Sequence, residues 1–246
     1  MELEQQEEIV KIEKAQVISQ KAFEQALTTL KVGQTESEIA DTLAKIIKSL
    51  GAQGLAFEPI IASGPNSGLP HHFTGDRRLS LNDILLFDFG AKYQNYCADL
   101  SRTVFFGKAP DLRKNIFNHV LTAQKKALAA VKQGIKQHEP FHAANNHFKE
   151  NKLEKYFLHS LGHGVGLEVH EAPYLRPPAP SNQQTTSPAD GSTTNNQRLT
   201  SNMVFSVEPG LYFPWGGVRI EDLVVIQNGK AKVLGRLLDE LIELDI

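Results

Sequence analysis

Residues 84–100 read Ile-Leu-Leu-Phe-Asp-Phe-Gly-Ala-Lys-Tyr-Gln-Asn-Tyr-Cys-Ala-Asp-Leu, two runs of branched and aromatic residues around a short polar turn. Such runs are typical of the two strands of an antiparallel hairpin. A turn centred on Tyr93-Gln94 would place Asp88 directly opposite Asp99, with their Cβ atoms about 5 Å apart. The hairpin therefore predicts a close pair of acidic side chains among apolar neighbours.

A second hairpin of the same kind is predicted nearer the C-terminus. Strand-like residues on both sides of Pro214-Trp215 would fold so that Glu208 lies opposite Glu221. Like charges that face each other in apolar strands repel and resist desolvation, so such pairs must take up protons or bind cations. We expect cations, because four carboxylates, together with an imidazole from the segment His159–Glu171, suit a pair of divalent ions such as Mn²⁺, Co²⁺, Fe²⁺ or Zn²⁺.

Histidines gather in the segment His159–Glu171, which carries three of them around three glycines at alternate positions. The glycines make a helix improbable and allow the backbone to approach another group closely. A lone histidine is more often a core or surface residue. Three histidines around a glycine-rich strand favour one metal ligand and two partners that face the substrate. The loop Leu69–Phe73 adds His71 and His72, a weak signal by itself.

The rest of the chain predicts helices in both halves, so the fold class is mixed α/β. We expect helices over about residues 3–30, 35–51, 111–131 and 140–153, and strands over 84–91, 96–106, 203–213 and 218–226. Thr35 with Glu38 forms a capping-box pattern, and Gly51 is a natural stop for that helix. Residues 176–200 have almost no apolar side chains and predict a mobile loop.

Composition limits the classes of partner. The chain has 246 residues, 41% hydrophobic composition and a formal charge of −2. This length is enough to bury one large core, or to form two halves of about 120 residues each. It has no dense Lys/Arg block, so nucleic acid is not an expected partner. Cys97 is the only cysteine, which agrees with a reducing compartment, and we expect a cytoplasmic protein. Neither a signal-peptide pattern nor an apolar run of about 18 residues is present, so no membrane partner is expected.

Taken together, these motifs resemble the pita-bread metallopeptidase family, which includes methionine aminopeptidases, Xaa-Pro aminopeptidases and prolidases. The resemblance covers nearly the whole chain and rests on Asp88–Val104, His159–Glu171, Val207–Gly210 and Val218–Asp222. It implies a pita-bread fold of α/β (α+β) class, in which antiparallel sheet and helices repeat about a pseudo-two-fold axis. It also implies one catalytic domain over residues 1–246, with the low-complexity loop at about 176–200.

Most proline-directed members of the family have a further N-terminal domain that helps them to dimerise, and we expect none here. The oligomeric state is therefore left open between a monomer and a homodimer.

The resemblance assigns the metal ligands residue by residue. Asp88 is implied to bind one metal, Asp99 and Glu221 to bridge two metals, and His163 with Glu208 to complete the second. The cofactors implied are two divalent ions per chain, Mn²⁺ first, with Co²⁺, Zn²⁺ or Fe²⁺ as alternatives.

Substrate roles follow from the same resemblance. His170 matches the histidine that touches the scissile peptide group. His71 matches the substrate-side histidine after proline, with His72 as a shifted alternative. His159 resembles the additional histidine of the proline-directed branch, and Arg219 resembles an arginine that orients nearby carboxylates.

The implied reaction is hydrolysis of the bond between an N-terminal residue and proline in short peptides. A bridging water would attack, and Glu208 would act as proton shuttle, with His71 and His170 holding or protonating the intermediate. One alternative is a methionine aminopeptidase, which matches the compact size but usually has another residue where His159 stands. The other is a metal-free binding module of the same fold, which would be expected to have lost ligands that are present here.

Overall fold

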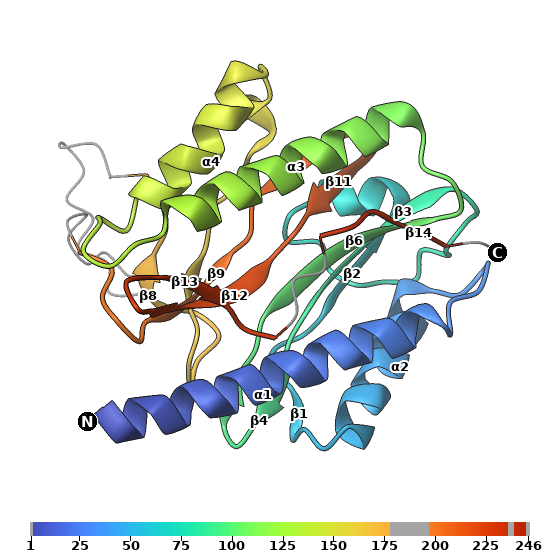
Figure 1. Cartoon of the computed structure of the whole chain (residues 1–246). Coiled ribbons are helices and arrows are strands. Elements are labelled where there is room, and N and C mark those ends of the chain that lie inside the picture. The colour runs from blue at the N-terminus through green and yellow to red at the C-terminus, as the bar shows by residue number, and fades with distance from the viewer. Residues whose placement is uncertain (1, 178–196, 236–238, 245–246) are drawn as a thin grey trace.

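The computed structural model describes residues 2–177, 197–235 and 239–244 (Figure 1). Its α-helices in these ranges are α1 (Glu2–Leu27), α2 (Glu36–Ser49), α3 (Asp111–Ala130) and α4 (Glu139–Glu150). All four expected helices are thereby confirmed. The capping box at the start of α2 is also confirmed, because the Thr35 side chain accepts from the Glu38 N–H and the Glu38 side chain accepts from the Thr35 N–H.

Three strands from the first half of the chain and one from its C-terminal end build a four-stranded sheet of order β14-β6-β3-β2. Its strands are β2 (Ile60–Ser63), β3 (Asp83–Phe89), β6 (Leu100–Phe106) and β14 (Ile242–Leu244). Helices α1 and α2 pack on it through a buried apolar cluster in which Phe23 meets Phe87 edge to face, with ring centroids 5.4 Å apart. A small sheet of β1 (Gly54–Leu55), β4 (Ala91–Tyr93) and β5 (Tyr96–Cys97) adjoins it.

The second half repeats this plan with a five-stranded sheet of order β13-β12-β9-β7-β8. Its strands are β7 (His163–Gly164), β8 (Glu171–Tyr174), β9 (Val204–Val207), β12 (Asp222–Gln227) and β13 (Lys230–Val233). The hairpin β10 (Gly210–Phe213) and β11 (Gly216–Arg219) continues from it. Helices α3 and α4 share a core with β9 to β12, and they lie on the opposite side of the molecule from α1 and α2 (Figure 1).

Helix α1 joins the two halves. Its later residues, such as Phe23, belong to the core of the first half, whereas Ile9 and Ile12 pack with Val165, Val204 and other residues of the second sheet. The arrangement is the mixed α/β fold that the sequence predicts, with a helix pair and a sheet in each half. Both sheets are antiparallel except where β14 pairs with β6 in parallel.

The predicted register of the first hairpin is wrong by two residues. Asp88 pairs with Ser101 and not with Asp99, which lies between β5 and β6. The reason is the turn: Gln94 and Asn95, with φ of 48° and 71°, form its two central residues, so the hairpin is centred one residue later than expected. The strand also leaves the sheet at Gly90, where a Cβ would lie 1.7 Å from the Ala98 carbonyl oxygen.

The predicted register of the second hairpin is confirmed. Phe213 pairs with Gly216 around Pro214-Trp215, and Val207 pairs with Asp222. The same register, continued by one residue from the Val207–Asp222 pair toward the turn, places Glu208 opposite Glu221. The close backbone approach expected for the glycines of His159–Glu171 is confirmed at Gly162, where a Cβ would lie 2.0 Å from the Ser206 carbonyl oxygen.

Two expectations concern features outside these elements. Most of the loop expected over residues 176–200 lies outside the described residues. None of the helices in the described ranges has the length and apolar character needed to cross a membrane.

Candidate metal centre and its cavity

A cavity of about 460 Å³ receives residues from both halves of the fold. Nine of the ten residues predicted for the site line it. They are His71, Asp88, Asp99, His159, His163, His170, Glu208, Arg219 and Glu221. His72 does not line this cavity.

The centre of the cavity holds three buried groups that meet the distance requirement for a shared metal ion. Asp99, His163 and Glu221 each offer one ligand atom, and these atoms lie within 4.8 Å of one another. His163 Nε2 lies 3.7 Å from Asp99 Oδ2 and 3.3 Å from Glu208 Oε1. Main-chain structure fixes them: His163 begins β7, Glu208 follows β9, and Glu221 precedes β12.

The carboxylates of Asp99 and Glu221 are short of partners. Asp99 Oδ1 and Glu221 Oε1 are buried, and neither has a hydrogen-bond partner in the described part of the chain. Burial, together with the neighbouring carboxylates, raises the pKa of both groups well above the ordinary range. Buried acceptors of this kind need a proton or a cation, so the residues present fit a divalent metal centre.

Asp88 and Glu221 are linked through a network around Arg219. Arg219 Nη2 donates to Asp88 Oδ2 at 2.5 Å, and Arg219 Nε donates to Ser101 Oγ at 2.8 Å. Ser101 Oγ in turn donates to Glu221 Oε2 at 2.8 Å. Arg219 is 3% exposed, so this fixed cation orients carboxylates on both sides of the cavity.

A second chain of hydrogen bonds runs from Arg219 to His159. Arg219 Nη1 donates to the Tyr212 hydroxyl at 2.8 Å, and that hydroxyl lies 2.8 Å from His159 Nε2. Because His159 Nδ1 lies 2.7 Å from the Ser160 carbonyl oxygen, Nδ1 carries the proton and Nε2 accepts from Tyr212. Burial lowers the pKa of His159 to about 4, so the imidazole is neutral at pH 7.

Two further histidines face the metal-type cluster. The His170 ring lies 4.2 Å from the His163 ring, centroid to centroid, and burial and His163 lower the pKa of His170. His71 lines the cavity from the loop that follows the 3₁₀ helix η1 (Gly64–Gly68).

Glu208 differs from the other carboxylates of the centre. Burial by itself would raise its pKa, but the hydrogen bond and the charge of His163 lower that pKa to about 2. Ser206 Oγ also donates to Glu208 Oε1 at 3.1 Å. Glu208 and His163 therefore form the charged pair of the cluster.

His72 points away from the cluster. Its Nε2 lies 2.8 Å from Oε2 of Glu36, a buried residue of α2. Residues that the sequence reasoning missed include Ser101, Tyr212 and the apolar walls Phe57, Ile60 and Leu158. The predicted register of the second hairpin already makes Tyr212 a diagonal neighbour of Arg219.

The fold and the sequence both match known metallopeptidases. The profile of metallopeptidase family M24 matches residues 10–228. The chain belongs to metallopeptidase family M24. Among its M24 relatives, the Xaa-Pro dipeptidase of Pyrococcus horikoshii is 39% identical over 241 residues, which are 98% of this chain and 64% of that protein.

Solved M24 structures are similar over most of the chain. The X-Pro aminopeptidase of Thermotoga maritima MSB8 has a TM-score of 0.88 at 37% identity, covering 97% of this chain and 64% of that one. The prolidase of Pyrococcus furiosus has a TM-score of 0.84 at 39% identity, covering 94% of this chain and 64% of that one. The M24 chain described here thus spans less than two thirds of the length of these relatives.

Proposed function

We propose that this protein hydrolyses the peptide bond between an N-terminal residue and a following proline in short peptides. The observation that carries the proposal is the pair of buried, unpartnered carboxylate oxygens of Asp99 and Glu221 beside His163. Within an M24 chain whose relatives are named Xaa-Pro dipeptidase, prolidase and X-Pro aminopeptidase, this cluster supports a proline-directed metallopeptidase.

Five residues are proposed to hold two divalent ions, for which we favour Mn²⁺. They are Asp88, Asp99, His163, Glu208 and Glu221. When bound, such ions lower the pKa of water and stabilise negative charge on the carbonyl oxygen under attack. Arg219 and Ser101 would keep Asp88 and Glu221 oriented, since both already bond to these carboxylates.

The remaining roles belong to groups around the cluster. We assign proton transfer to Glu208, which lies among the ligands, and contact with the reacting peptide group to His170 and His71. His159, neutral at pH 7, would contact substrate without adding charge to the cavity. Phe57, Ile60 and Leu158 provide apolar wall for a proline ring, which has no N–H to satisfy.

The test is release of the N-terminal residue from an Xaa-Pro dipeptide, an Xaa-Pro tripeptide and a Met-Ala tripeptide. Metal-stripped protein is reloaded with Mn²⁺, and Asp99→Ala serves as the inactive control. Cleavage of the proline substrates alone supports the proposal, and the ratio of dipeptide to tripeptide cleavage defines the substrate length. Cleavage of Met-Ala alone would identify a methionine aminopeptidase instead. Two bound metals without cleavage of any of the three would overturn the substrate class.

Two further proposals accompany this one. The described residues form one catalytic unit, which works as a monomer or a homodimer. The single cysteine, Cys97, supports a reducing compartment, for which we propose the cytoplasm. Light scattering of the metal-loaded protein tests the first proposal, and fractionation of cells tests the second.

A further inference from the structure

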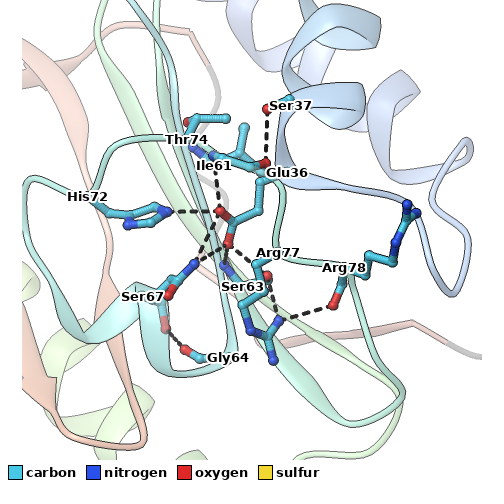
Figure 2. Close-up of polar contacts among 12 residues, drawn as sticks. Glu36, Ser37, Ile61, Ser63, Gly64, Ser67, His72, Thr74, Arg77 and Arg78 are labelled. Carbon is cyan, nitrogen blue, oxygen red and sulfur yellow. Dashed lines mark hydrogen bonds and ion pairs between the residues drawn. The ribbon is translucent and has the colours of Figure 1, made fainter.

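Glu36 is a buried carboxylate outside the cavity. It is the first residue of α2, directly after the N-cap Thr35, and it is 1% exposed. Figure 2 shows its two oxygens surrounded by donors. Oε1 accepts from the Ser63 N–H at 2.7 Å, from Ser63 Oγ at 2.8 Å and from Asn66 Nδ2 at 3.0 Å. Oε2 accepts from His72 Nε2 at 2.8 Å and from the Gly75 N–H at 3.3 Å.

All of these donors belong to one stretch of chain, residues 63–75. This active-site loop leaves β2 at Ser63, passes through η1, carries His71 and His72, and returns to α2 at Gly75. The first turn of α2 also donates to the end of this loop, because the Ser37 N–H and Ser37 Oγ both donate to the Gly75 carbonyl oxygen, at 3.0 and 2.9 Å. A single carboxylate thus ties together the start, the middle and the end of the loop.

The cavity side of the loop is held by a different element. The Pro70 carbonyl oxygen accepts from Arg219 Nη1 at 3.1 Å, and Ser67 Oγ accepts from the Gly217 N–H at 2.9 Å. His71 therefore stands between two fixed neighbours. Pro70 is bonded to the arginine that orients the Asp88 carboxylate, and His72 is bonded to Glu36.

The electrostatics of Glu36 agree with a permanently charged anchor. Burial alone would raise its pKa, but the hydrogen bonds from the Ser63 N–H, His72, Ser63 Oγ and Asn66 lower that pKa below its ordinary value. Its place at the N-terminus of α2 also favours a negative charge. The anchor is consequently ionised throughout the neutral range.

We propose that Glu36 is a positioning residue, which through His72 sets the place of the His71 imidazole in the active cavity. The inference rests on the proposed peptidase function for the role of His71, but the placement itself is independent of the reaction. It also gives His72 a role different from substrate contact: His72 is the link between the buried carboxylate and the cavity.

The kinetic test compares Glu36→Gln with Glu38→Gln in Mn²⁺-loaded protein. Both changes remove one negative charge from the first turn of α2, but Glu38 is exposed, and within the described residues its carboxylate bonds only to the Thr35 N–H. In Glu36→Gln we expect kcat on an Xaa-Pro dipeptide to fall by about tenfold to a hundredfold, because a misplacement of about 1 Å costs this much. Metal content should stay as in the wild type. Glu38→Gln should retain the wild-type kcat.

A double-mutant cycle tests whether Glu36 acts through His71. If it does, Glu36→Gln added to His71→Ala should lower kcat by less than about twofold beyond His71→Ala alone. Multiplicative losses in the double variant would overturn the proposal.

Two variants of His72 test the link between Glu36 and His71 while leaving the buried Glu36 unchanged. His72→Ala should reproduce the loss of Glu36→Gln. His72→Gln, which keeps a donor toward Glu36, should recover most of the lost kcat. Equal losses in the two His72 variants would contradict a positioning role.

One measurement does not depend on activity. Imidazole NMR signals of the metal-free protein, labelled with ¹⁵N-histidine, should shift for both His71 and His72 in Glu36→Gln and for neither in Glu38→Gln. A shift confined to His72, or none, would overturn the placement. If the wild type cleaves no proline peptide while both signals shift, the proposed function fails and the placement stands.

Discussion

Two buried carboxylate environments lie on the two sides of the active-site loop, and their partners differ. Glu36 has donors on both of its oxygens, and its pKa is lowered. Asp99 and Glu221 each keep one buried oxygen without a partner in the described residues, and their pKa values are raised. Both environments are almost closed to solvent, so burial alone does not explain the difference.

The difference lies in what the chain supplies to neutralise the charge. At Glu36 the protein provides backbone N–H groups, hydroxyls, an amide and an imidazole. At Asp99 and Glu221 it provides mainly other carboxylates, with Ser101 on one oxygen of Glu221. A buried acid that lacks donors is incomplete until a cation arrives, whereas one with donors is complete as folded. The donor-poor environment of Asp99 and Glu221 therefore suits a metal centre, and the donor-rich environment of Glu36 suits an anchor.

The largest effect should come from Asp99→Asn. The change removes a ligand from the cluster, and we expect the hydrolysis of an Xaa-Pro dipeptide to fall by at least about a thousandfold, together with loss of bound metal. Metal analysis after dialysis and initial rates measure the two losses. The control is Asp41→Asn, which neutralises an exposed aspartate on α2. A variant that keeps two metals and full activity would show that Asp99 is not a ligand.

The next largest effect should be the loss of stability when the metals are removed. A divalent ion that binds only the folded state at about a hundred times its Kd adds about 2.7 kcal/mol to the free energy of unfolding. Thermal unfolding of stripped and Mn²⁺-loaded protein should therefore differ by several degrees. Glu36→Gln should show the same metal-dependent rise, and Asp99→Asn should lose most of it. Equal loss of the rise in both variants would erase the distinction between the two environments.

The anchor should contribute less to stability, and its contribution should depend on pH. Hydrogen bonds to a charged group are each worth about 1.5–3 kcal/mol, so Glu36→Gln should lower the free energy of unfolding at pH 7 by about 2 kcal/mol. The pKa of Glu36 is lowered in the folded state from its ordinary 4.5, so this contribution is present above 4.5 and is lost as pH falls through the folded value. Urea unfolding of metal-free wild type and variant between pH 3 and 7 measures the difference. A gap that widened toward acid pH would contradict this sign.

The sequence predicted the cluster better than it predicted the geometry that forms it. Glu208 and Glu221 were correctly paired, because Pro214-Trp215 marks the turn unambiguously. Asp88 and Asp99 were paired in the wrong register, because the left-handed conformation of Gln94 and Asn95 moves the centre of the turn by one residue. Asp99 lines the cavity nonetheless, from the two residues between β5 and β6, next to Ala98, on which Gly90 packs closely.

Glu36 could not have been found in the sequence. A glutamate in the first turn of a helix is common, because it favours the helix dipole, and it is usually exposed. Its meaning depends on a loop that returns to the helix 27 to 39 residues later in the chain. The same holds for His72, which sequence reasoning placed beside the substrate and which the fold turns toward α2.

The smallest expected effect concerns Tyr212, which shares one feature with each of the two environments. It borders the metal-type cluster, but, like Glu36, its polar group has protein partners: its hydroxyl accepts from Arg219 and donates to His159. Tyr212→Phe removes both of these hydrogen bonds. Arg219 Nη1 still donates to the Pro70 carbonyl oxygen and Nη2 still donates to Asp88, so His159 Nε2 is the atom left without its partner. Because Arg219 keeps acceptors for both Nη atoms, the main cost is the neutral hydrogen bond lost by His159, which is worth about 1 kcal/mol. We therefore expect kcat/KM on an Xaa-Pro dipeptide to fall about fivefold with unchanged metal content.

The matched control for Tyr212→Phe is Tyr96→Phe, whose hydroxyl bonds to Glu8 at an exposed position. That variant should keep the wild-type kcat/KM. A loss above a hundredfold in Tyr212→Phe would mean that the hydroxyl acts on the substrate itself. No loss would mean that His159 needs no donor to hold its orientation. A loss near fivefold places Tyr212 with Glu36, as a group whose partners within the protein prepare a histidine, and apart from the carboxylates whose partner must come from solution.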